Sequence, residues 1–116
     1  MTITYSFINQ PLNPARFHVT FSRRALEQFL ELEIYVAEAS YSTRAERFID
    51  SLIDHCEQLS TFPHRGVVRN DIRPGLRVTH YRKRTVIAFV VLENRVEILG
   101  IFHGGRDYAA ILRQTD

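Results

Sequence analysis

Residues 76–103 read LRVTHYRKRTVIAFVVLENRVEILGIFH, and three segments within them have the patterns of β-strands. Residues 76–82 alternate between apolar and polar side chains, which is typical of a strand with one buried face. Residues 85–92 are apolar on both faces, which indicates a central strand, and residues 95–103 alternate before they turn apolar. Because both connecting turns are short, the three segments are expected to pair as antiparallel hairpins.

Two helices are predicted before these strands. Residues 23–39 place an apolar stripe opposite a polar one, and Ser22 is positioned to cap the first turn. Thr43 and Glu46 have the spacing of a capping box at the start of a second helix. Because few residues separate the two helices, we expect them to run antiparallel as a hairpin. The apolar stripe of the second helix consists of Ala45, Phe48, Ile49, Leu52, Ile53, Cys56 and Leu59.

The remaining segments complete the predicted domain. Residues 17–21 alternate as a short strand, and residues 62–75, which contain proline and glycine, are expected to form a loop. Residues 106–113 are expected to form a short C-terminal helix. We interpret residues 1–15 as an irregular N-terminal arm that precedes a single domain over residues 16–116.

The order of these elements predicts an α+β fold with the pattern β-α-α-β-β-β. The economical way to bury their apolar faces is to pack the antiparallel helical hairpin on one face of a small twisted, mainly antiparallel four-stranded sheet. The other face of the sheet is then expected to be left partly open.

Two side chains on the predicted helices deserve separate predictions. Glu33 falls within the apolar stripe of its helix, and a buried carboxylate needs a partner. We therefore expect an arginine to reach Glu33, and a salt bridge is a more ordinary reason for this residue than catalysis. Cys56 lies on the apolar stripe of the second helix and is expected to be a buried apolar residue rather than a nucleophile.

The composition limits the class of protein. The chain has 116 residues, 45% of them apolar, which suffices for one domain with its own core. A single cysteine excludes a disulfide framework and fits a reducing cytoplasm. No apolar run is long enough to span a membrane, and the first residues lack the pattern of a secretory signal, so no membrane partner is expected. The five histidines share no ligand spacing, so we expect neither a metal nor a cofactor.

Charge is distributed unevenly along the sequence. Residues 23–61 contain 8 acidic and 4 basic side chains, whereas residues 62–84 contain 7 basic side chains and one acidic side chain. A patch of this sign favours an acidic partner, either protein or nucleic acid, and a solvated basic loop without a partner is the alternative. The predicted partner-binding patch consists of Arg65, Arg69, Arg73, Arg77, Arg82, Lys83 and Arg84.

One set of residues suggests catalysis. The predicted sheet brings Arg77, Tyr81, His103 and Arg106 towards one another, because the first and last of the three C-terminal strands flank the central one. Such a set could cleave a phosphodiester, with His103 or Tyr81 as the base and the arginines stabilising the charged transition state. In the structural alternative, Arg77 pairs with Glu33 or another carboxylate and His103 simply ends its strand. No other catalytic residues are assigned.

Five motifs follow one another along the sequence: Ala25-x-x-Gln28-Phe29-x-x-Leu32-x-x-Tyr35-Val36, Leu59-x-x-Phe62-Pro63-x-x-Gly66, Pro74-Gly75-Leu76-Arg77, Val86-Ile87-Ala88-Phe89-Val90-Val91, and Val96-Glu97-Ile98-Leu99-Gly100-Ile101-Phe102-His103-Gly104-Gly105-Arg106-Asp107. Taken together in this order, they resemble the RelE/ParE superfamily of type II toxin–antitoxin toxins, and most closely its ParE branch. The resemblance extends from about residue 16 to residue 112.

This resemblance implies a small toxin that a cognate ParD-like antitoxin holds inactive. ParE-like toxins poison DNA gyrase, so gyrase is the expected target and the chain would not be an enzyme. RelE-like relatives cut messenger RNA on the ribosome, which is the alternative, with the four residues above as the catalytic set. The single lysine, Lys83, and the glycine that follows His103 depart from patterns of the nuclease relatives. A binding module without toxicity is a third class that the sequence leaves open.

Overall fold

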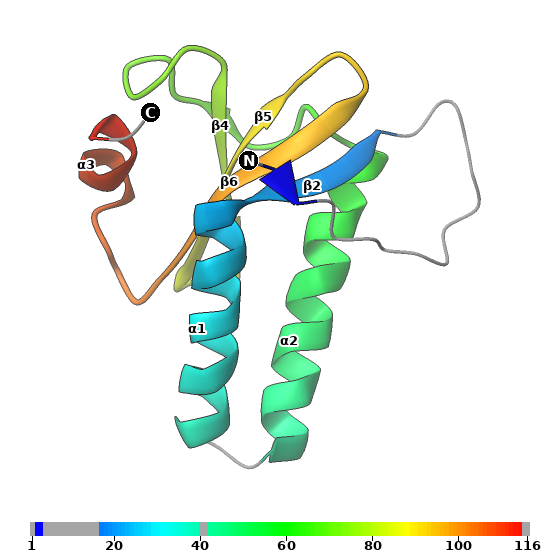
Figure 1. Ribbon diagram of the computed structural model, residues 1–116, viewed down its shortest axis with the longest axis vertical. Helices are drawn as coiled ribbons and strands as arrows, with labels where there is room; N and C mark the ends of the chain where they lie inside the picture. The colour runs from blue at the N-terminus through cyan, green and yellow to red at the C-terminus, as the bar shows by residue number, and fades with distance from the viewer. Residues whose placement is uncertain (1, 4–16, 40–41, 115–116) are drawn as a thin grey trace.

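The computed structural model of the protein describes residues 2–3, 17–39 and 42–114. Helices and strands form one α+β unit, as predicted (Figure 1). The elements in chain order are β1 (Thr2–Ile3), β2 (His18–Ser22), α1 (Arg23–Ala39), α2 (Ser42–Glu57), the short 3₁₀ helix η1 (Gln58–Ser60), β3 (Val67–Val68), β4 (Leu76–Tyr81), β5 (Thr85–Val91), β6 (Arg95–His103) and α3 (Tyr108–Arg113).

The strands form one sheet in the order β1-β2-β6-β5-β4-β3. Its centre, β2-β6-β5-β4, consists of the four predicted strands. Within it β2 is parallel to β6, and the other neighbours are antiparallel. The mainly antiparallel sheet of the predicted fold class is therefore confirmed, as are both hairpins between residues 76 and 103.

Two short strands at the edges of the sheet differ from the prediction. Thr2–Ile3 form β1 and pair with β2, so the N-terminal arm is not irregular throughout; its residues 1 and 4–15 lie outside the described part of the chain. Val67–Val68 form β3 and pair with β4, within the segment 62–75 that was expected to be only a loop. A strand of two residues is too short to show an alternating pattern, and its pairing becomes visible only in the fold.

Helices α1 and α2 form the predicted antiparallel hairpin and lie side by side (Figure 1). The Ser22 side chain caps α1 as expected, because its Oγ accepts a hydrogen bond from the Ala25 backbone N–H at 3.1 Å. Helix α2 begins at Ser42, so Thr43 lies inside the helix and not at its cap. Residues 40–41, between the helices, lie outside the described part of the chain.

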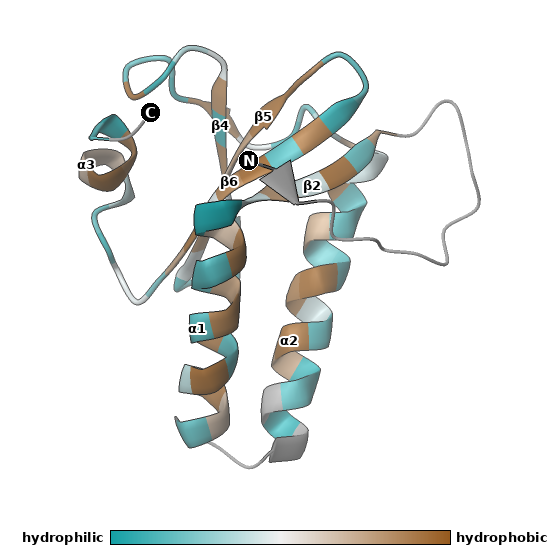
Figure 2. Cartoon of the chain, viewed as in Figure 1, coloured by the Kyte–Doolittle hydropathy of each residue, from teal (hydrophilic) through white to brown (hydrophobic). Residues whose placement is uncertain are grey.

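The main core lies between the helical hairpin and the sheet. Apolar and hydrophilic residues alternate along both helices (Figure 2), and the buried apolar side chains of the helices pack against those of the strands. The Phe21 ring packs edge-on against Phe29, with ring centroids 6.0 Å apart. Each fully buried large apolar side chain stabilises the fold by about 1.5–3 kcal/mol. The core residues are Val19, Phe21, Ala25, Phe29, Leu32, Ile49, Leu52, Cys56, Leu59, Tyr81, Ile87, Phe89, Val96, Ile98 and Ile101.

A second, smaller core lies on the opposite face of the sheet. Here α3 packs over the strands, so this face is more covered than the sequence suggests. Arg69 donates to the Tyr108 hydroxyl at 3.0 Å, and Arg73 donates to the Leu112 carbonyl oxygen at 3.3 Å. These two bonds tie α3 to the loop before β4. The buried residues of this second core are Ile72, Leu76, Val78, Ala88, Phe102 and Leu112.

The prediction for Glu33 is wrong. Its side chain is exposed, and no salt bridge to it is found among the described residues. The buried positions Ala25, Phe29 and Leu32 define a narrower apolar face than the sequence suggests. Glu33 follows Leu32 by one residue, which rotates it by about 100° around the helix and places it on the solvent side of the stripe.

Cys56 is buried in the main core, and we expect its thiol to be unreactive in the folded protein. Its side chain is fully inaccessible, and burial raises the pKa of the thiol to about 12, which leaves almost no thiolate at neutral pH. A disulfide reagent such as dithionitrobenzoate should label no thiol at pH 8 and one thiol per chain after unfolding in urea. Rapid stoichiometric labelling of the native protein would show that the helix is not packed as described.

Candidate functional site

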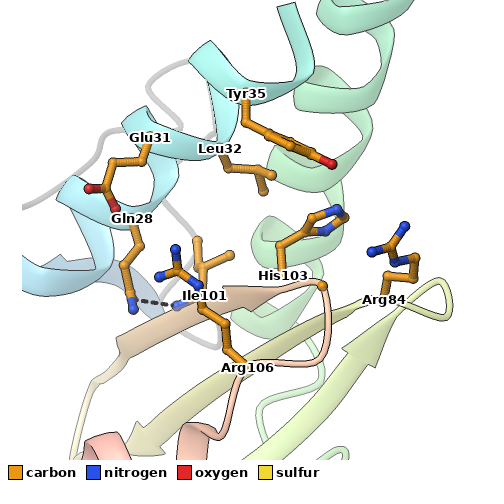
Figure 3. A pocket seen from close by; sticks show the side chains of 9 residues that line it. Gln28, Glu31, Leu32, Tyr35, Arg84, Ile101, His103 and Arg106 are labelled. Atoms are coloured by element: carbon orange, nitrogen blue, oxygen red, sulfur yellow. Dashed lines mark hydrogen bonds between the residues drawn. The ribbon is translucent and has the colours of Figure 1, made fainter. Parts of the chain in front are cut away.

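A pocket of about 290 Å³ lies between α1, the end of β6 and the β4–β5 turn (Figure 3). It combines an apolar wall with charged and polar side chains at its rim. Its volume is near the lower end of pockets that bind small molecules. The residues that line it are Gln28, Glu31, Leu32, Tyr35, Arg84, Ile101, His103, Gly104 and Arg106.

Backbone contacts at the end of β6 set the positions of the basic side chains. Thr85 pairs with His103 across β5 and β6, and the Thr85 hydroxyl lies 2.9 Å from Nδ1 of His103. The Gly104 N–H donates to the Arg84 carbonyl oxygen at 2.9 Å, which ties the segment after β6 to the β4–β5 turn. Gly104 adopts a positive φ of 80°, a conformation that favours glycine, and the chain then continues to Arg106. As a result, Arg84 and Arg106 lie on opposite sides of His103 (Figure 3).

Helix α1 supplies the other wall of the pocket. The Gln28 side chain accepts a hydrogen bond from the Ile101 N–H at 2.8 Å through Oε1, which fixes α1 against β6. The Tyr35 ring lies beside His103, with centroids 5.7 Å apart, and is 52% exposed. The ring of Phe48 on α2 contacts His103 from another side at 6.1 Å. The imidazole is thus held by Thr85 and by two aromatic rings.

The pocket has an excess of positive charge. No ion pair to Arg84 or Arg106 is found in the part of the chain that the structure describes, and Glu31 is the one carboxylate in the lining. Burial, and then the neighbouring Arg84, lower the pKa of His103 below its ordinary value. The imidazole is therefore neutral near pH 7, and its Nε2 is the ring nitrogen left for a ligand.

The structure separates the four residues of the predicted catalytic set. His103 and Arg106 share the pocket. Tyr81 is buried and donates its hydroxyl hydrogen to Oγ of Ser51. Arg77 lies four residues away from Tyr81 along β4 and donates a hydrogen bond to the His64 carbonyl oxygen at 2.9 Å. The structural alternative, in which Arg77 pairs with a carboxylate, therefore also differs from what the structure shows. The predicted set therefore does not form one site.

The basic residues between 62 and 84 lie at two ends of β4. Arg82, Lys83 and Arg84 occupy the turn after this strand, and Arg82 stacks over the rings of Phe48 and Tyr81. The other four lie in or near the loop before β4. Of these, Arg65 donates to Gln58 and Arg69 holds Asp71 through two hydrogen bonds of 2.9 and 2.8 Å, whereas Arg73 and Arg77 bind carbonyl oxygens.

Three pocket residues are not singled out as functional by the sequence. Gln28, Glu31 and Tyr35 follow a spacing of three and then four residues, which places them on one face of α1. The sequence pattern makes Gln28 and Glu31 part of a solvent-facing stripe. Tyr35 lies on the same face of α1 as Gln28 and Glu31. An aromatic side chain on a face that otherwise looks solvent-exposed is the sequence signal that this face lines a site.

None of the helices in the described residues is long and apolar enough to cross a membrane. Nor do three or more histidine, cysteine, aspartate or glutamate side chains of the described residues gather in an arrangement that could hold a metal ion.

The pKa values of two histidines are lowered in the folded protein, so we expect its stability to depend on pH. Burial, followed by the charge of Arg65, lowers the pKa of His55, and that of His103 is lowered as described above. In the unfolded chain both rings take up a proton near pH 6.5. Their contribution to stability is therefore complete above that pH and is lost as the pH falls towards the lower pKa of the folded state.

Urea unfolding at pH 7.5 and pH 5.5 measures this effect. The free energy of unfolding should be smaller at pH 5.5, and His55→Gln should reduce the difference between the two pH values because it removes one of the protonation steps. A nuclear magnetic resonance titration that gives His55 a pKa at or above 6.5 in the folded protein would contradict the prediction.

Comparisons with known proteins agree with this fold. The family model for the ParE toxin of type II toxin–antitoxin system, parDE, matches residues 19–108. Among solved structures, the chain is similar to one described as the chromosomal ParDE TA system from P. aeruginosa. The TM-score is 0.65 at 18% sequence identity, and the match covers 77% of this chain and 97% of that chain. Comparison with curated proteins gives no match.

The fold and the family match define the class of protein as the toxin component of a type II toxin–antitoxin system. The matched residues include the main strands and both long helices. The chain belongs to the ParE toxin family of parDE systems. The resemblance to the ParE branch is thus confirmed, and membership implies an antitoxin partner.

Proposed function

We propose that the chain is a non-enzymatic toxin that acts in the cytoplasm by inhibiting DNA gyrase and is neutralised by a ParD-like antitoxin. The observation that carries the non-enzymatic part is the separation of Arg77 and Tyr81 from His103 and Arg106. A general base must lie within hydrogen-bond reach of the proton that it removes. Tyr81 is buried with its hydroxyl bonded to Ser51, and Arg77 is bound to loop carbonyls. Family membership supports gyrase as the target.

Exposed apolar side chains support a docking surface for the antitoxin. On α1, Leu30 is 48% and Ile34 is 61% exposed, and their spacing of four residues places them on one face. At the sheet edge, Val67 and Val68 of β3 are exposed too. An amphipathic antitoxin helix would cover the first pair, and an extended antitoxin segment would pair with β3.

A supercoiling assay with purified gyrase tests the target. We expect the purified chain to abolish supercoiling as its concentration approaches that of gyrase, and an equimolar amount of the cognate antitoxin to restore it. The preformed toxin–antitoxin complex, added at the same concentration, is the control. Full supercoiling activity in a large excess of free, folded toxin would rule out gyrase as the target.

Antitoxin binding is tested separately on α1. Ile34→Asp places a charge at the centre of the proposed docking face and should weaken antitoxin binding by tenfold or more, on the order of a single lost hot-spot contact. His80→Asp, an equally charged change at an exposed position of β4, is the control and should leave binding unchanged. If the two variants bind the antitoxin equally well, the antitoxin does not dock on this face of α1.

A second candidate is a ribosome-dependent endoribonuclease, favoured by the presence of His103, Arg106 and Glu31 in one pocket. For this activity His103→Gln and Arg106→Ala should each abolish transcript cleavage in a translation extract while antitoxin binding persists. Intact transcripts in the presence of the unmodified toxin would reject this candidate and leave the gyrase proposal unaffected.

A further inference from the structure

Five cationic side chains gather where the first part of α2 meets the β4–β5 turn. Three of them form the turn, and each of these is exposed. The Arg82 guanidinium lies 5.6 Å from the centre of the Phe48 ring of α2. Arg47 directly precedes Phe48, Arg44 precedes it by about one helical turn, and both arginines are exposed. We call the following residues the α2–turn patch: Arg44, Arg47, Arg82, Lys83 and Arg84.

The positive charge of the α2–turn patch is not neutralised by carboxylates of the described residues. No ion pair to any of its five side chains is found among them. Glu46 and Asp50, the nearest carboxylates along α2, each lie two residues from Phe48. Two residues turn the helix by about 200°, so both carboxylates lie on the side of α2 away from the turn. The patch therefore favours an anionic partner.

Arg82 is held in position while its hydrogen-bond donors stay accessible. Its guanidinium stacks over the rings of Tyr81 and Phe48, at 5.1 and 5.6 Å from their centres. Stacking uses the face of the guanidinium, so the N–H groups in its plane are available for phosphate oxygens. The Arg82 backbone adopts φ +56°, which is uncommon for residues other than glycine. A strained conformation kept in an exposed turn indicates a functional role for its side chain.

The composition of the α2–turn patch fits a nucleic acid better than a protein. Protein–protein interfaces have an apolar centre inside a polar rim, whereas interfaces with DNA are more polar and strongly positive. Four of the five cations are arginines, whose planar forks match phosphate oxygens. None of the exposed large apolar side chains of the described residues belongs to α2 or to the turn. These side chains are Leu30, Ile34, Tyr35, Phe62, Val67, Val68 and Leu92.

The aromatic rings beside the patch favour a duplex over a single strand. Proteins that bind single strands stack the bases on exposed aromatic rings. Here Arg82 covers the rings of Phe48 and Tyr81, and Tyr81 is only 7% exposed. Cations spread over a turn and a helix instead match a row of phosphates, because a DNA duplex carries one negative charge per about 1.7 Å of its axis.

We propose that the α2–turn patch docks on the phosphate backbone of double-stranded DNA, with its side chains on different phosphates and without reading the base sequence. Phosphate contacts of this kind position a protein on the duplex and carry no sequence information. The choice of DNA rests on the proposed function, because supercoiling by gyrase is a reaction of double-stranded DNA. The contact places the toxin next to the DNA on which its proposed target acts.

Fluorescence anisotropy of a labelled DNA duplex of about 20 base pairs, titrated with the full chain, tests the proposal. We expect saturable binding at 50 mM salt with a Kd below about 10 µM. The plot of log K against log salt concentration should have a slope of about −3 to −4.5, because each neutralised phosphate contributes about −0.9. Absence of saturation at about 100 µM toxin, or a slope shallower than about −1, overturns the proposal.

Variants locate the DNA on the molecule. Arg82→Gly should weaken binding at 50 mM salt by about fivefold and make the slope about one unit shallower, and glycine suits the positive φ, so the fold is kept. Arg44→Ala combined with Arg47→Ala should make the slope about two units shallower. Circular dichroism melting of each variant verifies the fold.

Arg65→Ala is the matched control for Arg82→Gly. Arg65 also stacks over an aromatic ring, that of Phe62 at 5.5 Å, but it lies in the loop before β4, at the other end of that strand. Its substitution removes the same charge and should leave the slope unchanged. A loss as large as in Arg82→Gly would mean that the whole surface attracts DNA, and the assignment to the α2–turn patch would then be wrong.

Competition separates DNA from other polyanions. Poly-L-glutamate of equal total charge and single-stranded DNA of equal length should displace the labelled duplex less well than unlabelled duplex does, because their linear charge density is lower. Equal displacement by poly-L-glutamate would point to an acidic protein as the partner and overturn the proposal. Tighter binding of single-stranded DNA, or of an RNA duplex of the same length, would overturn it as well.

The DNA-docking proposal and the gyrase proposal can fail separately. The anisotropy assay contains no gyrase, and the supercoiling assay measures gyrase activity. A toxin that binds the duplex through the α2–turn patch but leaves supercoiling intact contradicts only the gyrase target. A toxin that abolishes supercoiling but does not bind the duplex contradicts only the docking surface.

Discussion

Gly66→Ala is expected to destabilise the protein by about 2–5 kcal/mol, one of the two largest effects of a single substitution that we predict. Gly66 adopts φ +85°, and a Cβ added there would lie 2.5 Å from the Val78 carbonyl oxygen. Two effects oppose the substitution. Alanine is strained at positive φ, and its Cβ would clash with a backbone atom of β4 that cannot easily move away. Relief would require β4 to move, and Val78 is paired with Ala88 of β5 and with Val67 of β3.

Gly75→Ala is the matched control for this prediction. Gly75 has a similar φ of +78°, but a Cβ there would meet nothing within 4 Å. Its substitution should therefore show the backbone strain alone, about 1–2 kcal/mol. Urea unfolding of the two variants gives the difference in the free energy of unfolding. Equal losses would mean that Gly66 does not approach β4 as the structure describes.

The long elements of this fold were predictable because their patterns repeat. The central strands and the two long helices each contain enough residues to show an alternating or a helical period. By contrast, β1 and β3 have two residues each and depend on pairing that no local pattern reveals. The error at Glu33 has a similar origin, because the width of the buried stripe on α1 is set by what packs against it.

The candidate site was only partly predictable from the sequence. His103 and Arg106 could be placed together because they are neighbours at the end of one strand. Arg77 could not be assigned, because its guanidinium turns to the His64 and Arg65 carbonyl oxygens, in a loop whose path has no sequence signature. Tyr35 enters the pocket only because α1 crosses β6 there, and such a crossing is a property of tertiary packing.

Phe102→Ala is expected to lower the free energy of unfolding by about 3–5 kcal/mol. Phe102 is 1% exposed and belongs to the second core with Leu76, Val78 and Leu112. Its ring also contacts Tyr108 of α3, with centroids 6.1 Å apart. Removing the ring therefore leaves a cavity beneath α3 in addition to the lost burial, and a helix of six residues has little stability of its own to compensate.

The loss of the Phe102 ring should also loosen α3 locally, an effect that a measurement of global stability does not detect. In Phe102→Ala, amide hydrogens of residues 108–113 should exchange faster relative to those of α2, because α3 loses part of the surface that holds it while the main core is intact. Phe62→Ala is the control: Phe62 is 58% exposed and contacts Arg65 at 5.5 Å, so its loss should cost under about 1 kcal/mol. If the exchange of α3 is unchanged in Phe102→Ala, α3 does not depend on this core, and its polar contacts with Arg69, Asp71 and Arg73 in the loop before β4 must hold it in place.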